Sequence, residues 1–399
     1  MNINTQCRIC GCKELIKFLD LGDHPLANSF LKTKEQEEKL YPLQVAWCKE
    51  CNLVQLLHVV DRDILYRDYI YFSSGVLKLS EYFRKYAEDV MQYVERGDFI
   101  VEIASNDGIL LKFFKDEGFE IQGIDPAINI AKTAEQLGVP TIPDYFSEEL
   151  ADKIGKKAKL IIANNVVAHT DDHQDMMRGV FKLLDENGVF IIEAPYLVDM
   201  FENLTYDTIY HEHLSYLSVR SLKYLLEKHG LEIFKVEVHE IQGRSLRVFI
   251  GHKGVFDIHH SVQEYIDIEL RLGLDKIDAY QELAARIIDQ KAQLQTMLKE
   301  LSKTKKIAGY AASAKGNTLL NYCRIDCLDY ILDHMKAKQG LFTPGTHLPI
   351  VSAEYAEQNP PDYFLMLAWN YEKQILAKEV DFRKNGGKFI VPVEGIKIV

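Results

Sequence analysis

The sequence lacks the features that mark membrane-spanning, secreted and disordered chains. It has no run of about 18 or more apolar residues, which a transmembrane helix would need. The opening residues, MNINTQCRICG, show no basic stretch followed by an apolar run, so we expect no secretory signal and a cytoplasmic location. Only 11 prolines and 23 glycines occur among 399 residues, which excludes collagen-like and low-complexity classes.

A basic excess is also missing. The chain has 47 Lys and Arg residues against 59 Asp and Glu residues, a formal net charge of −12. Because nucleic-acid binding requires a basic face, we expect no nucleic-acid partner, whereas a local pocket can still hold a small anion. The length, with 47% hydrophobic residues, suggests two or three domains with sizeable cores.

The seven cysteines are unevenly distributed, and five of them lie in the first 51 residues. They form two C-x-x-C pairs, C-R-I-C and C-K-E-C. Disulfides are rare in a reducing compartment, and four thiolates match the closed tetrahedral coordination of structural zinc. The alternative is a set of free buried thiols. We predict a structural Zn²⁺ site formed by Cys7, Cys10, Cys48 and Cys51, with Cys12 outside it.

Beyond a turn-rich stretch at 1–75, the chain alternates apolar runs with helical patterns. Such alternation is typical of mostly parallel α/β sheets. A long helical stretch at 262–305 separates two α/β series. We expect a helix at 76–96 and strands at 99–104, 120–125, 160–168 and 188–195, then at 306–312, 330–333, 363–369 and 388–393.

The run V-E-I-A-S-N-D-G-I-L (101–110) predicts a strand, a tight turn and a helix. Small residues occupy positions where nucleotide-binding turns carry glycines, and the next strand ends at an aspartate that can accept ribose hydroxyls. The missing glycines favour S-adenosylmethionine (SAM), which has no phosphate, over a dinucleotide; the alternative is an ordinary turn with a surface aspartate. A further polar run follows the strand at 160–168. The segment Asp-Tyr-Phe at 144–146 either forms a wall of an adenine pocket or belongs to the hydrophobic core. The predicted cofactor-binding residues are Glu102, Ala104, Asn106, Gly108, Asp125, Asn165 and His169.

The run T-I-Y-H-E-H-L-S-Y (208–216) concentrates protonatable side chains. A histidine beside a carboxylate suits proton abstraction. Metal binding by His-Glu-His is an alternative, although the spacing is not the helical zinc-protease motif. Two tyrosines at 69 and 71 share one face of a strand, which is either a site or a core face. The candidate catalytic residues are Tyr210, Glu212 and His213, with Tyr71 from the second group.

The chain resembles the zinc-containing, SAM-dependent C-methyltransferases that act on nucleotide-linked keto-deoxysugars, the dTDP-4-keto-sugar C-3′-methyltransferase type above all. The resemblance spans essentially the whole sequence. It runs through C-R-I-C-G, L-D-L-G-D-H-P-L-A-N-S-F (19–30), C-K-E-C-N-L-V-Q-L (48–56), Y-I-Y-F-S-S (69–74), E-I-A-S-N-D-G (102–108), G-I-D-P-A (123–127), N-V-V-A-H-T-D-D (165–172), Y-H-E-H-L-S-Y (210–216), A-A-S-A-K-G-N-T-L-L-N-Y (311–322) and K-Q-G-L-F-T-P-G-T-H-L-P-I (338–350).

The resemblance implies an α/β protein with an N-terminal zinc-binding module (1–75) and two Rossmann-like, doubly wound domains. These are a SAM-binding domain (76–261) and a C-terminal domain (262–399) that helps to bind a nucleotide sugar. His213 carries over as the base that removes the C3 proton beside a 4-keto group. The chain departs from the family pattern at His334-Met335 and at 242–244, which bears on the choice of sugar.

A strand–turn–helix and a turn at 344–347 in the second series offer backbone N–H groups to the phosphates of such a substrate. Two other functions stay open: an O- or N-methyltransferase on a nucleotide sugar, and a non-catalytic nucleotide-sugar-binding protein. No membrane partner is expected. The candidate substrate-binding residues are Lys315, Asn317, Asp333 and His347.

Overall fold

The computed structural model describes residues 2–67, 72–75, 79–241, 243–393 and 395–399. The first 60 residues contain more strand than their turn-rich sequence suggests. The strands β2 (Leu15–His24), β3 (Tyr41–Cys48) and β4 (Val54–Leu56) form an antiparallel sheet in the order β11-β4-β3-β2. Its edge strand β11 (Ser215–Tyr216) comes from the middle of the chain. The short strands β1 (Asn2–Ile3) and β5 (His58–Val59) pair separately, and helix α1 (Arg62–Tyr66) follows.

The middle of the chain forms a seven-stranded sheet in the order β12-β13-β10-β9-β6-β7-β8. Its parallel strands are β6 (Phe99–Ile103), β7 (Glu120–Ile124), β8 (Thr141–Ile142), β9 (Ala158–Asn164) and β10 (Leu184–Pro195). The antiparallel strands β12 (Leu231–His239) and β13 (Ser245–His252) complete it. Every residue of β6 is buried, because helices cover a parallel sheet on both faces.

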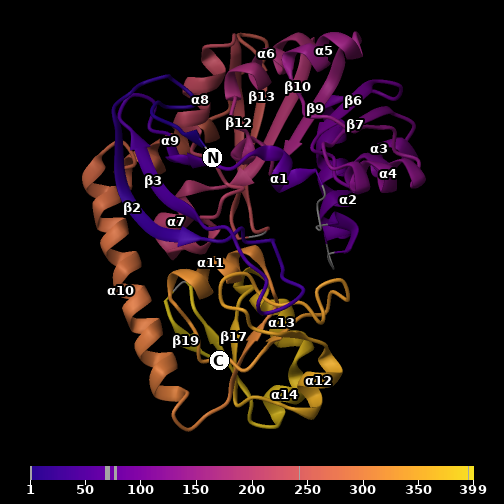
Figure 1. Cartoon of the computed structure of the whole chain (residues 1–399). Helices are drawn as coiled ribbons and strands as arrows, with labels where there is room; N and C mark the ends of the chain where they lie inside the picture. Colours follow the sequence, from indigo (N-terminus) through magenta and orange to yellow (C-terminus); the bar gives the residue numbers. More distant parts are fainter. Residues whose placement is uncertain (1, 68–71, 76–78, 242, 394) are drawn as a thin grey trace.

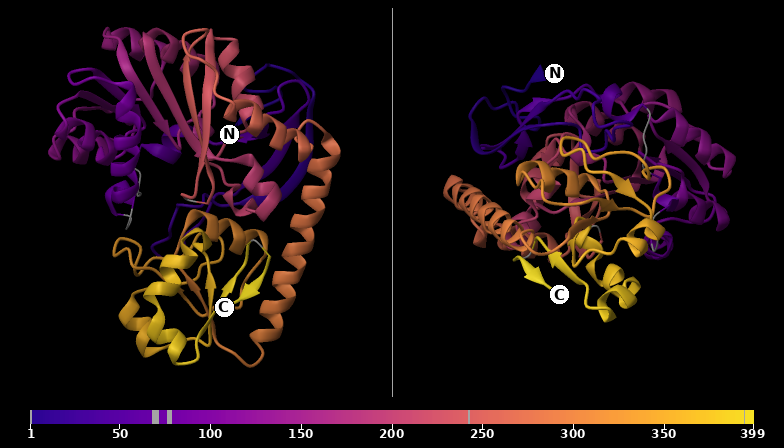
Figure 2. Two further views of the ribbon diagram at one scale, coloured as in Figure 1. Left: turned by 180° about the vertical axis from the view of Figure 1, so that it is seen from behind. Right: turned by 60° about the horizontal axis from the view of Figure 1, so that its bottom comes forward.

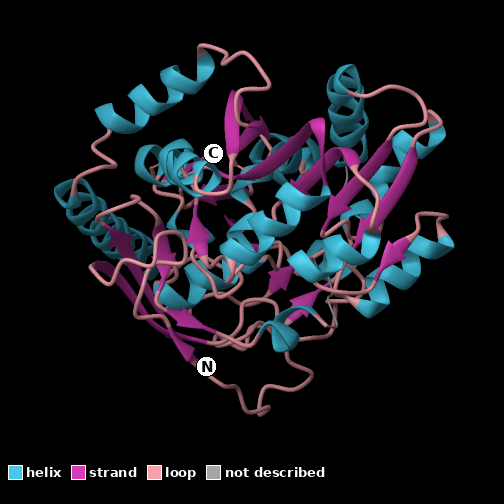
Figure 3. Cartoon of the chain, turned by 90° about the horizontal axis from the view of Figure 1, so that it is seen from above, coloured by secondary structure: helices cyan, strands magenta, loops and turns pink. Residues whose placement is uncertain are grey.

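The helices of this lobe are amphipathic or short and connect the strands. They are α2 (Leu79–Val90), α3 (Ile109–Asp116), α4 (Ile128–Gln136), α5 (Glu148–Ile154), α6 (His173–Leu183), α7 (Leu197–Asn203) and α8 (Val219–Glu227). Seen from above, helices lie on either side of the longest strands (Figure 3).

The C-terminal part forms a six-stranded sheet in the order β16-β15-β14-β17-β18-β19, parallel except for the last strand. Its strands are β14 (Ile307–Tyr310), β15 (Ile331–Leu332), β16 (Ile350–Val351), β17 (Tyr363–Met366), β18 (Lys388–Val391) and β19 (Lys397–Ile398). Its helices are α11 (Ala314–Tyr322), α12 (Ala353–Gln358), α13 (Glu372–Lys378) and α14 (Val380–Lys384).

Two helices, α9 (Ser261–Arg271) and α10 (Ile277–Leu301), connect the lobes. The 25 residues of α10 extend about 38 Å, and the helix runs along one side of both lobes (Figures 1 and 2). Its Tyr280 packs on the N-terminal sheet, 5.0 Å from Phe18 and 5.7 Å from Trp47 between ring centroids. The long helix therefore fixes the N-terminal sheet and the C-terminal lobe to one rigid support.

The predicted α/β fold with an N-terminal cysteine module is confirmed, and the differences are local. The strand expected over 160–168 ends at Asn164, because Asn165 has a left-handed φ of 53°, and a 3₁₀ turn follows at Val167–His169. The helical stretch at 262–305 is broken after Arg271, where Gly273 has a φ of 74°. Among the residues that the structure describes, no helix combines the length and apolarity that crossing a membrane requires.

Candidate metal centre and active-site cavity

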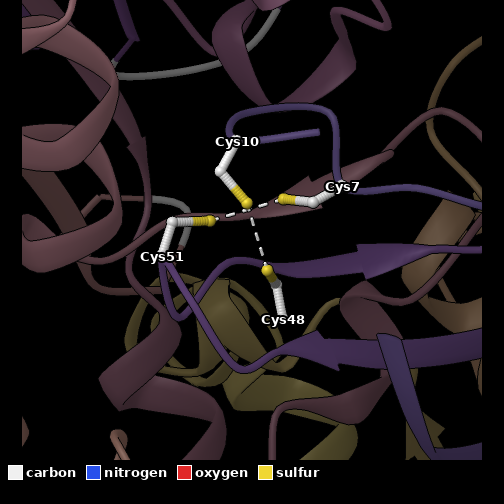
Figure 4. A group of neighbouring side chains, drawn as sticks. All are labelled: Cys7, Cys10, Cys48 and Cys51. Carbon is white, nitrogen blue, oxygen red and sulfur yellow. Dashed lines mark hydrogen bonds between the residues drawn. The ribbon is translucent and has the colours of Figure 1, made fainter. Parts of the chain in front are cut away.

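The sulfur atoms of the four predicted cysteines converge on one point. Those of Cys7 and Cys51 lie 3.4 Å apart, as do those of Cys10 and Cys48, and all four lie within 4.8 Å of one another (Figure 4). Sulfurs bound to one zinc ion at about 2.3 Å are about 3.8 Å from each other, so the cluster has the size that zinc requires. Four thiolates close the coordination shell, which fits a structural role.

Each pair of cysteines sits on a tight knuckle. The carbonyl of Cys7 accepts the N–H of Gly11 at 2.9 Å, and the carbonyl of Cys48 accepts the N–H of Asn52 at 3.0 Å. Gly11 and Asn52 have left-handed φ values of 75° and 60°, which is why glycine and asparagine stand there. Cys12 is not part of the cluster, as predicted.

A cavity of about 1430 Å³ lies between the central and C-terminal sheets. It is lined by the segments that follow β6, β7 and β9 and by those that follow β14, β15 and β17. These are the carboxyl ends of parallel strands, where open α/β sheets bind ligands. The cavity is also lined by Tyr210 and His213, so the protonatable segment lies between the two halves.

The turn after β6 keeps the backbone shape of a glycine-rich loop although only the last of its three glycine positions is a glycine. Ala104, Asn106 and Gly108 all adopt left-handed φ values, 57°, 50° and 77°. Ala104 and Asn106 line the cavity, whereas Gly108 precedes α3 away from it. A Cβ on Gly108 would lie 2.8 Å from Val139, so packing rather than ligand contact requires this glycine. The structure thus separates Gly108 from the other predicted cofactor residues.

Two buried carboxyl groups face the same part of the cavity. Asp125 accepts the N–H of Asn106 and the N–H of Ala127, each at 2.9 Å. Burial raises the pKa of Asp125 to about 6, although these hydrogen bonds act in the opposite direction. Burial also raises the pKa of Glu102 well above its usual value, and one of its oxygens has no hydrogen-bond partner among the described residues.

These carboxyl groups suit a ligand that brings hydroxyl donors and positive charge. SAM has both, in its ribose hydroxyls and in its ammonium and sulfonium groups, so the residues present fit this cofactor. Asn165 and the Asp144–Phe146 segment line the same cavity. The side-chain amide oxygen of Asn165 is buried and unpartnered among the described residues. The backbone N–H of Asn165 donates to the carbonyl of Glu193 at 2.7 Å.

One of the histidines that line the cavity, His213, is held in a defined tautomer. His213 Nδ1 lies 2.7 Å from the carbonyl oxygen of Thr208, which can only accept, so Nδ1 carries the proton. The other ring nitrogen, Nε2, lies 2.8 Å from the Tyr210 hydroxyl and accepts a hydrogen bond from it. Burial lowers the pKa of His213 well below its usual value. The ring is therefore neutral near pH 7, with a basic lone pair on Nε2.

The remaining members of this segment are bound to the N-terminal part. Glu212 accepts the Asn28 side-chain N–H at 2.7 Å, and His211 Nε2 lies 3.1 Å from the carbonyl oxygen of Tyr41. Neither residue lines the cavity. Within the described ranges, only the four cysteines gather three or more metal-binding side chains, so the structure gives no support to a His-Glu-His metal site.

His169 lies beside His213 and not only beside the turn after β6. Its ring centroid is 5.0 Å from that of His213 and 5.8 Å from that of Tyr66, with which it stacks. Burial lowers the pKa of His169 to about 4, so this ring is also neutral. Tyr71, the fourth catalytic candidate, lies outside the described residues.

The four substrate candidates divide into two that face the cavity and two that do not. Lys315 and Asp333 line the cavity. Asn317 donates its side-chain N–H to the carbonyl of Ala27 at 2.7 Å, and His347 pairs with Glu38 at 2.6 Å. The structure therefore places Asn317 and His347 at contacts with the N-terminal part and not with a ligand.

Lys338 lines the cavity and was absent from the sequence-based candidates. Its Nζ donates to the carbonyl of Ala312 at 2.7 Å, in the turn after β14. Asp333 accepts the N–H of Ala312 and the N–H of Met335, each at 2.7 Å, which repeats the pattern of Asp125 in the central lobe. In each α/β series an aspartate follows the second strand. This repetition is the sequence signal that points to the turn after β14.

Comparison with known proteins agrees with this arrangement. Three family models match successive parts of the chain: "Putative zinc binding domain" at residues 7–66, "Methyltransferase domain" at 79–236 and "C-methyltransferase C-terminal domain" at 240–394. The chain is also 35% identical over 405 residues to C-methyltransferase NovU of Streptomyces niveus, covering 99% of this chain and 96% of that protein.

Solved structures are similar only at a low level. A SAM-dependent methyltransferase from Archaeoglobus fulgidus matches with a TM-score of 0.36 and 16% identity, over 44% of this chain and 94% of that one. Magnesium protoporphyrin IX methyltransferase of Synechocystis PCC 6803, with bound SAM, matches with a TM-score of 0.34 and 11% identity, over 46% and 86%. The assignment rests on the full-length relative and the successive family models instead. The chain belongs to the family of zinc-containing sugar C-methyltransferases.

Proposed function

We propose that this protein methylates C3 of a nucleotide-linked 4-keto-deoxysugar, with dTDP as the expected nucleotide. The observation that carries the proposal is the Tyr210–His213 pair, which lies in one cavity between the turn that fits SAM and the lysine-bearing turn of the C-terminal lobe. A carbon nucleophile needs a base, and this pair supplies one. SAM, when bound, supplies an electrophilic methyl group.

His213 acts as the base. A 4-keto group acidifies the neighbouring C3–H, and Nε2 of the neutral ring has the lone pair that takes this proton. Nδ1 keeps its proton because it remains bonded to the carbonyl of Thr208. The resulting imidazolium is short-lived in a buried site that disfavours charge, so the proton is readily released again.

Tyr210 supplies the hydrogen bond that an enolate needs. In the structure its hydroxyl donates to Nε2, and this bond must break before the base can accept a proton from carbon. We propose that the hydroxyl turns to the 4-keto oxygen when substrate binds. The donor then stabilises the negative charge that develops on that oxygen, as in an oxyanion hole.

Lysines in the C-terminal lobe provide the anion-binding side of the cavity. Lys315 and Lys338 both line it, in a chain whose net charge is −12. Two buried carboxylates, Asp199 and Asp207, lie close enough to Lys315 to oppose the effect of burial on its pKa, which is lowered overall. Part of the Lys315 charge is therefore already balanced. We propose that Lys338 and Lys315 together hold the diphosphate.

The test is to separate C–H removal from methyl transfer. We expect the wild-type protein, incubated with dTDP-4-keto-deoxysugars in D₂O, to exchange the C3 proton without SAM and to give a product one methyl heavier with SAM. His213→Asn should lose both activities while still binding SAM. Methyl transfer to oxygen or nitrogen, with no C3 exchange, would instead support the O- or N-methyltransferase alternative. SAM binding without any turnover on a panel of nucleotide sugars would support a binding protein.

A further inference from the structure

Arg8 lies inside the first cysteine knuckle, yet its side chain contacts two segments outside the knuckle. Its Nε donates to the Asp171 carboxylate at 2.9 Å, and one terminal nitrogen donates to the carbonyl of Leu56 at 2.7 Å. The Arg8 side chain is 0% exposed, whereas that of Asp171 is 55% exposed. A fully buried arginine that spans two separate segments is expensive to desolvate, so its position calls for a reason.

The two contacts lead toward two of the histidines that line the cavity, His169 and His213. Asp171 lies two residues after His169 and lines the cavity itself. Leu56, on the other side, donates its N–H to the carbonyl of Leu214 at 3.0 Å, next to His213. The residues beside Leu56 and Leu214 are also paired, because strands β4 and β11 are antiparallel neighbours in one sheet.

Hydrogen bonds of the knuckle backbone hold Arg8 in place. The N–H of Arg8 donates to the side-chain oxygen of Gln55 at 3.1 Å, and the carbonyl of Ile9 accepts the Gln174 side chain at 2.8 Å. The N–H of Cys7 bonds to the carbonyl of Cys12 at 2.8 Å. The backbone around Arg8 is therefore tied both to the metal-binding loop and to helix α6.

We propose that Arg8 is a positioning residue that sets the placement of His169 relative to His213. The rings of these histidines have centroids 5.0 Å apart. The guanidinium binds the segment of His169 directly through Asp171, and it reaches the segment of His213 through Leu56, whose N–H bonds the carbonyl of Leu214. The inference rests on the proposed role of His213 as the base. It also gives the cysteine module a second task, since the knuckle that holds the metal holds Arg8 as well.

Only arginine meets this geometric requirement. The guanidinium is planar and donates from fixed directions, so its Nε and its terminal nitrogen can bond two acceptors at once. A lysine has one donor atom on a flexible stem and cannot bridge the same two acceptors rigidly. Arg8→Lys therefore keeps the charge and removes the bridge.

The experiment compares Arg8→Lys, Asp171→Ala and the double variant with the wild type. Arg178→Lys is the matched control, because Arg178 makes an Arg–carboxylate pair with Glu148 on the outer side of the same lobe. We expect both single variants to bind zinc as the wild type does and to lose about tenfold in kcat, with KM for the nucleotide sugar changed less than about twofold. The double variant should lose no more than the larger single loss, since the contact that Asp171→Ala removes is one of those that Arg8→Lys removes.

A second readout is independent of turnover. The ring nitrogen signals of His169 and His213 in heteronuclear NMR spectra should shift in Arg8→Lys and Asp171→Ala, and stay in place in Arg178→Lys. Unmoved signals in both test variants, or multiplicative losses of kcat in the double variant, would overturn the inference. If Arg8→Lys does not fold, Asp171→Ala decides alone, because the half-exposed Asp171 side chain lies outside the knuckle.

Failure of the proposed function is distinguishable from failure of this inference. If His213→Asn kept full methyl transfer, the base assignment would be wrong, while the NMR shifts would still show whether Arg8 places the rings. If the rings did not respond to Arg8→Lys, the inference would be wrong whichever residue is the base.

Discussion

The Tyr210 hydroxyl lies 2.8 Å from His213 Nε2, while His213 Nδ1 lies 2.7 Å from the carbonyl oxygen of Thr208. This pairing distinguishes the roles of the two side chains. We expect His213→Asn to lower C3 proton exchange by at least about 100-fold, the usual contribution of a general base. Tyr210→Phe frees Nε2 and removes the enolate donor, so exchange should fall by about tenfold only. The check is the rate of C3 exchange in D₂O without SAM, and equal losses in both variants would make Tyr210 the direct proton acceptor.

The pH dependence of the reaction should reflect a histidine with a depressed pKa. An ordinary histidine is about three-quarters protonated at pH 6. Burial lowers the pKa of His213 well below 6.5, and the neighbouring His169 adds to this effect when charged. Protonation of the base should therefore leave kcat nearly constant from pH 8 down to pH 6.

The measurement needs saturating SAM, because Asp125, with a pKa of about 6, titrates in the same range in the free protein. A fall of kcat centred near pH 6.5 at saturating SAM would contradict the buried, neutral state of His213.

Binding of SAM should depend on the Asp125 carboxylate. Its two oxygens accept the N–H groups of Asn106 and Ala127 and still have lone pairs for ligand hydroxyls. Asp125→Asn replaces one acceptor oxygen by a donor, so we expect the dissociation constant of SAM to rise at least about tenfold, or ~1.4 kcal/mol. Isothermal titration calorimetry checks this. Asp116→Asn, at an exposed position of α3, is the control for loss of one negative charge and should bind SAM normally.

The cysteine cluster should carry about one zinc ion per chain, since four thiolates complete its coordination. Cys48→Ser should lower the zinc content and the denaturant midpoint together, because metal binding stabilises such a module. Cys12→Ser changes a cysteine outside the cluster and should leave both unchanged. Metal analysis of protein purified without chelators, with urea unfolding of the same samples, is the measurement. Full zinc content in Cys48→Ser would remove Cys48 from the ligand set.

The packing of α9 on the central lobe should depend on Glu269. This buried residue accepts the N–H groups of Val219 and Arg220 and the hydroxyl of Tyr196, and burial raises its pKa from 4.5 to about 7. A carboxyl whose folded pKa is raised stabilises the fold fully below pH 4.5, and this contribution disappears as the pH rises through 7.

We therefore expect the free energy of unfolding of the wild type, relative to Glu269→Gln, to fall by at most about 3 kcal/mol between pH 4.5 and 7. Urea unfolding of both proteins at several pH values measures this difference in free energy of unfolding. The contributions of all other titrating groups cancel, because both proteins contain them. Glu264→Gln, at an exposed position of the same helix, should show no such trend. A constant difference between the wild type and Glu269→Gln would show that the group does not titrate in this range.

Local patterns were sufficient for the predictions that depend on neighbouring residues. The two C-x-x-C pairs predict a cluster because thiolates at that spacing share a knuckle, and the four sulfurs do converge. The run at 101–110 predicts a strand, turn and helix from an apolar run followed by small residues, and Ala104 and Asn106 have left-handed φ values in that turn. The alternation of apolar runs predicts the parallel strands, whose bounds differ by a few residues.

The tertiary structure decided which polar side chains face the cavity. Four protonatable residues follow each other at 210–213, but Asn28 binds Glu212 and Tyr41 binds His211, so only Tyr210 and His213 line the cavity. Asn317 and His347 are likewise bonded to Ala27 and Glu38, about 300 residues earlier in the chain.

The physical reason is that hydrogen-bond partners and burial come from segments distant in sequence. The pairing of β11 with β4 places a strand from the middle of the chain in the N-terminal sheet, and Arg8 reaches Asp171 across 163 positions. A sequence states which chemistry a side chain can perform, because that depends on its own atoms. Whether the side chain is free to perform it depends on these distant contacts, which only the folded chain brings together.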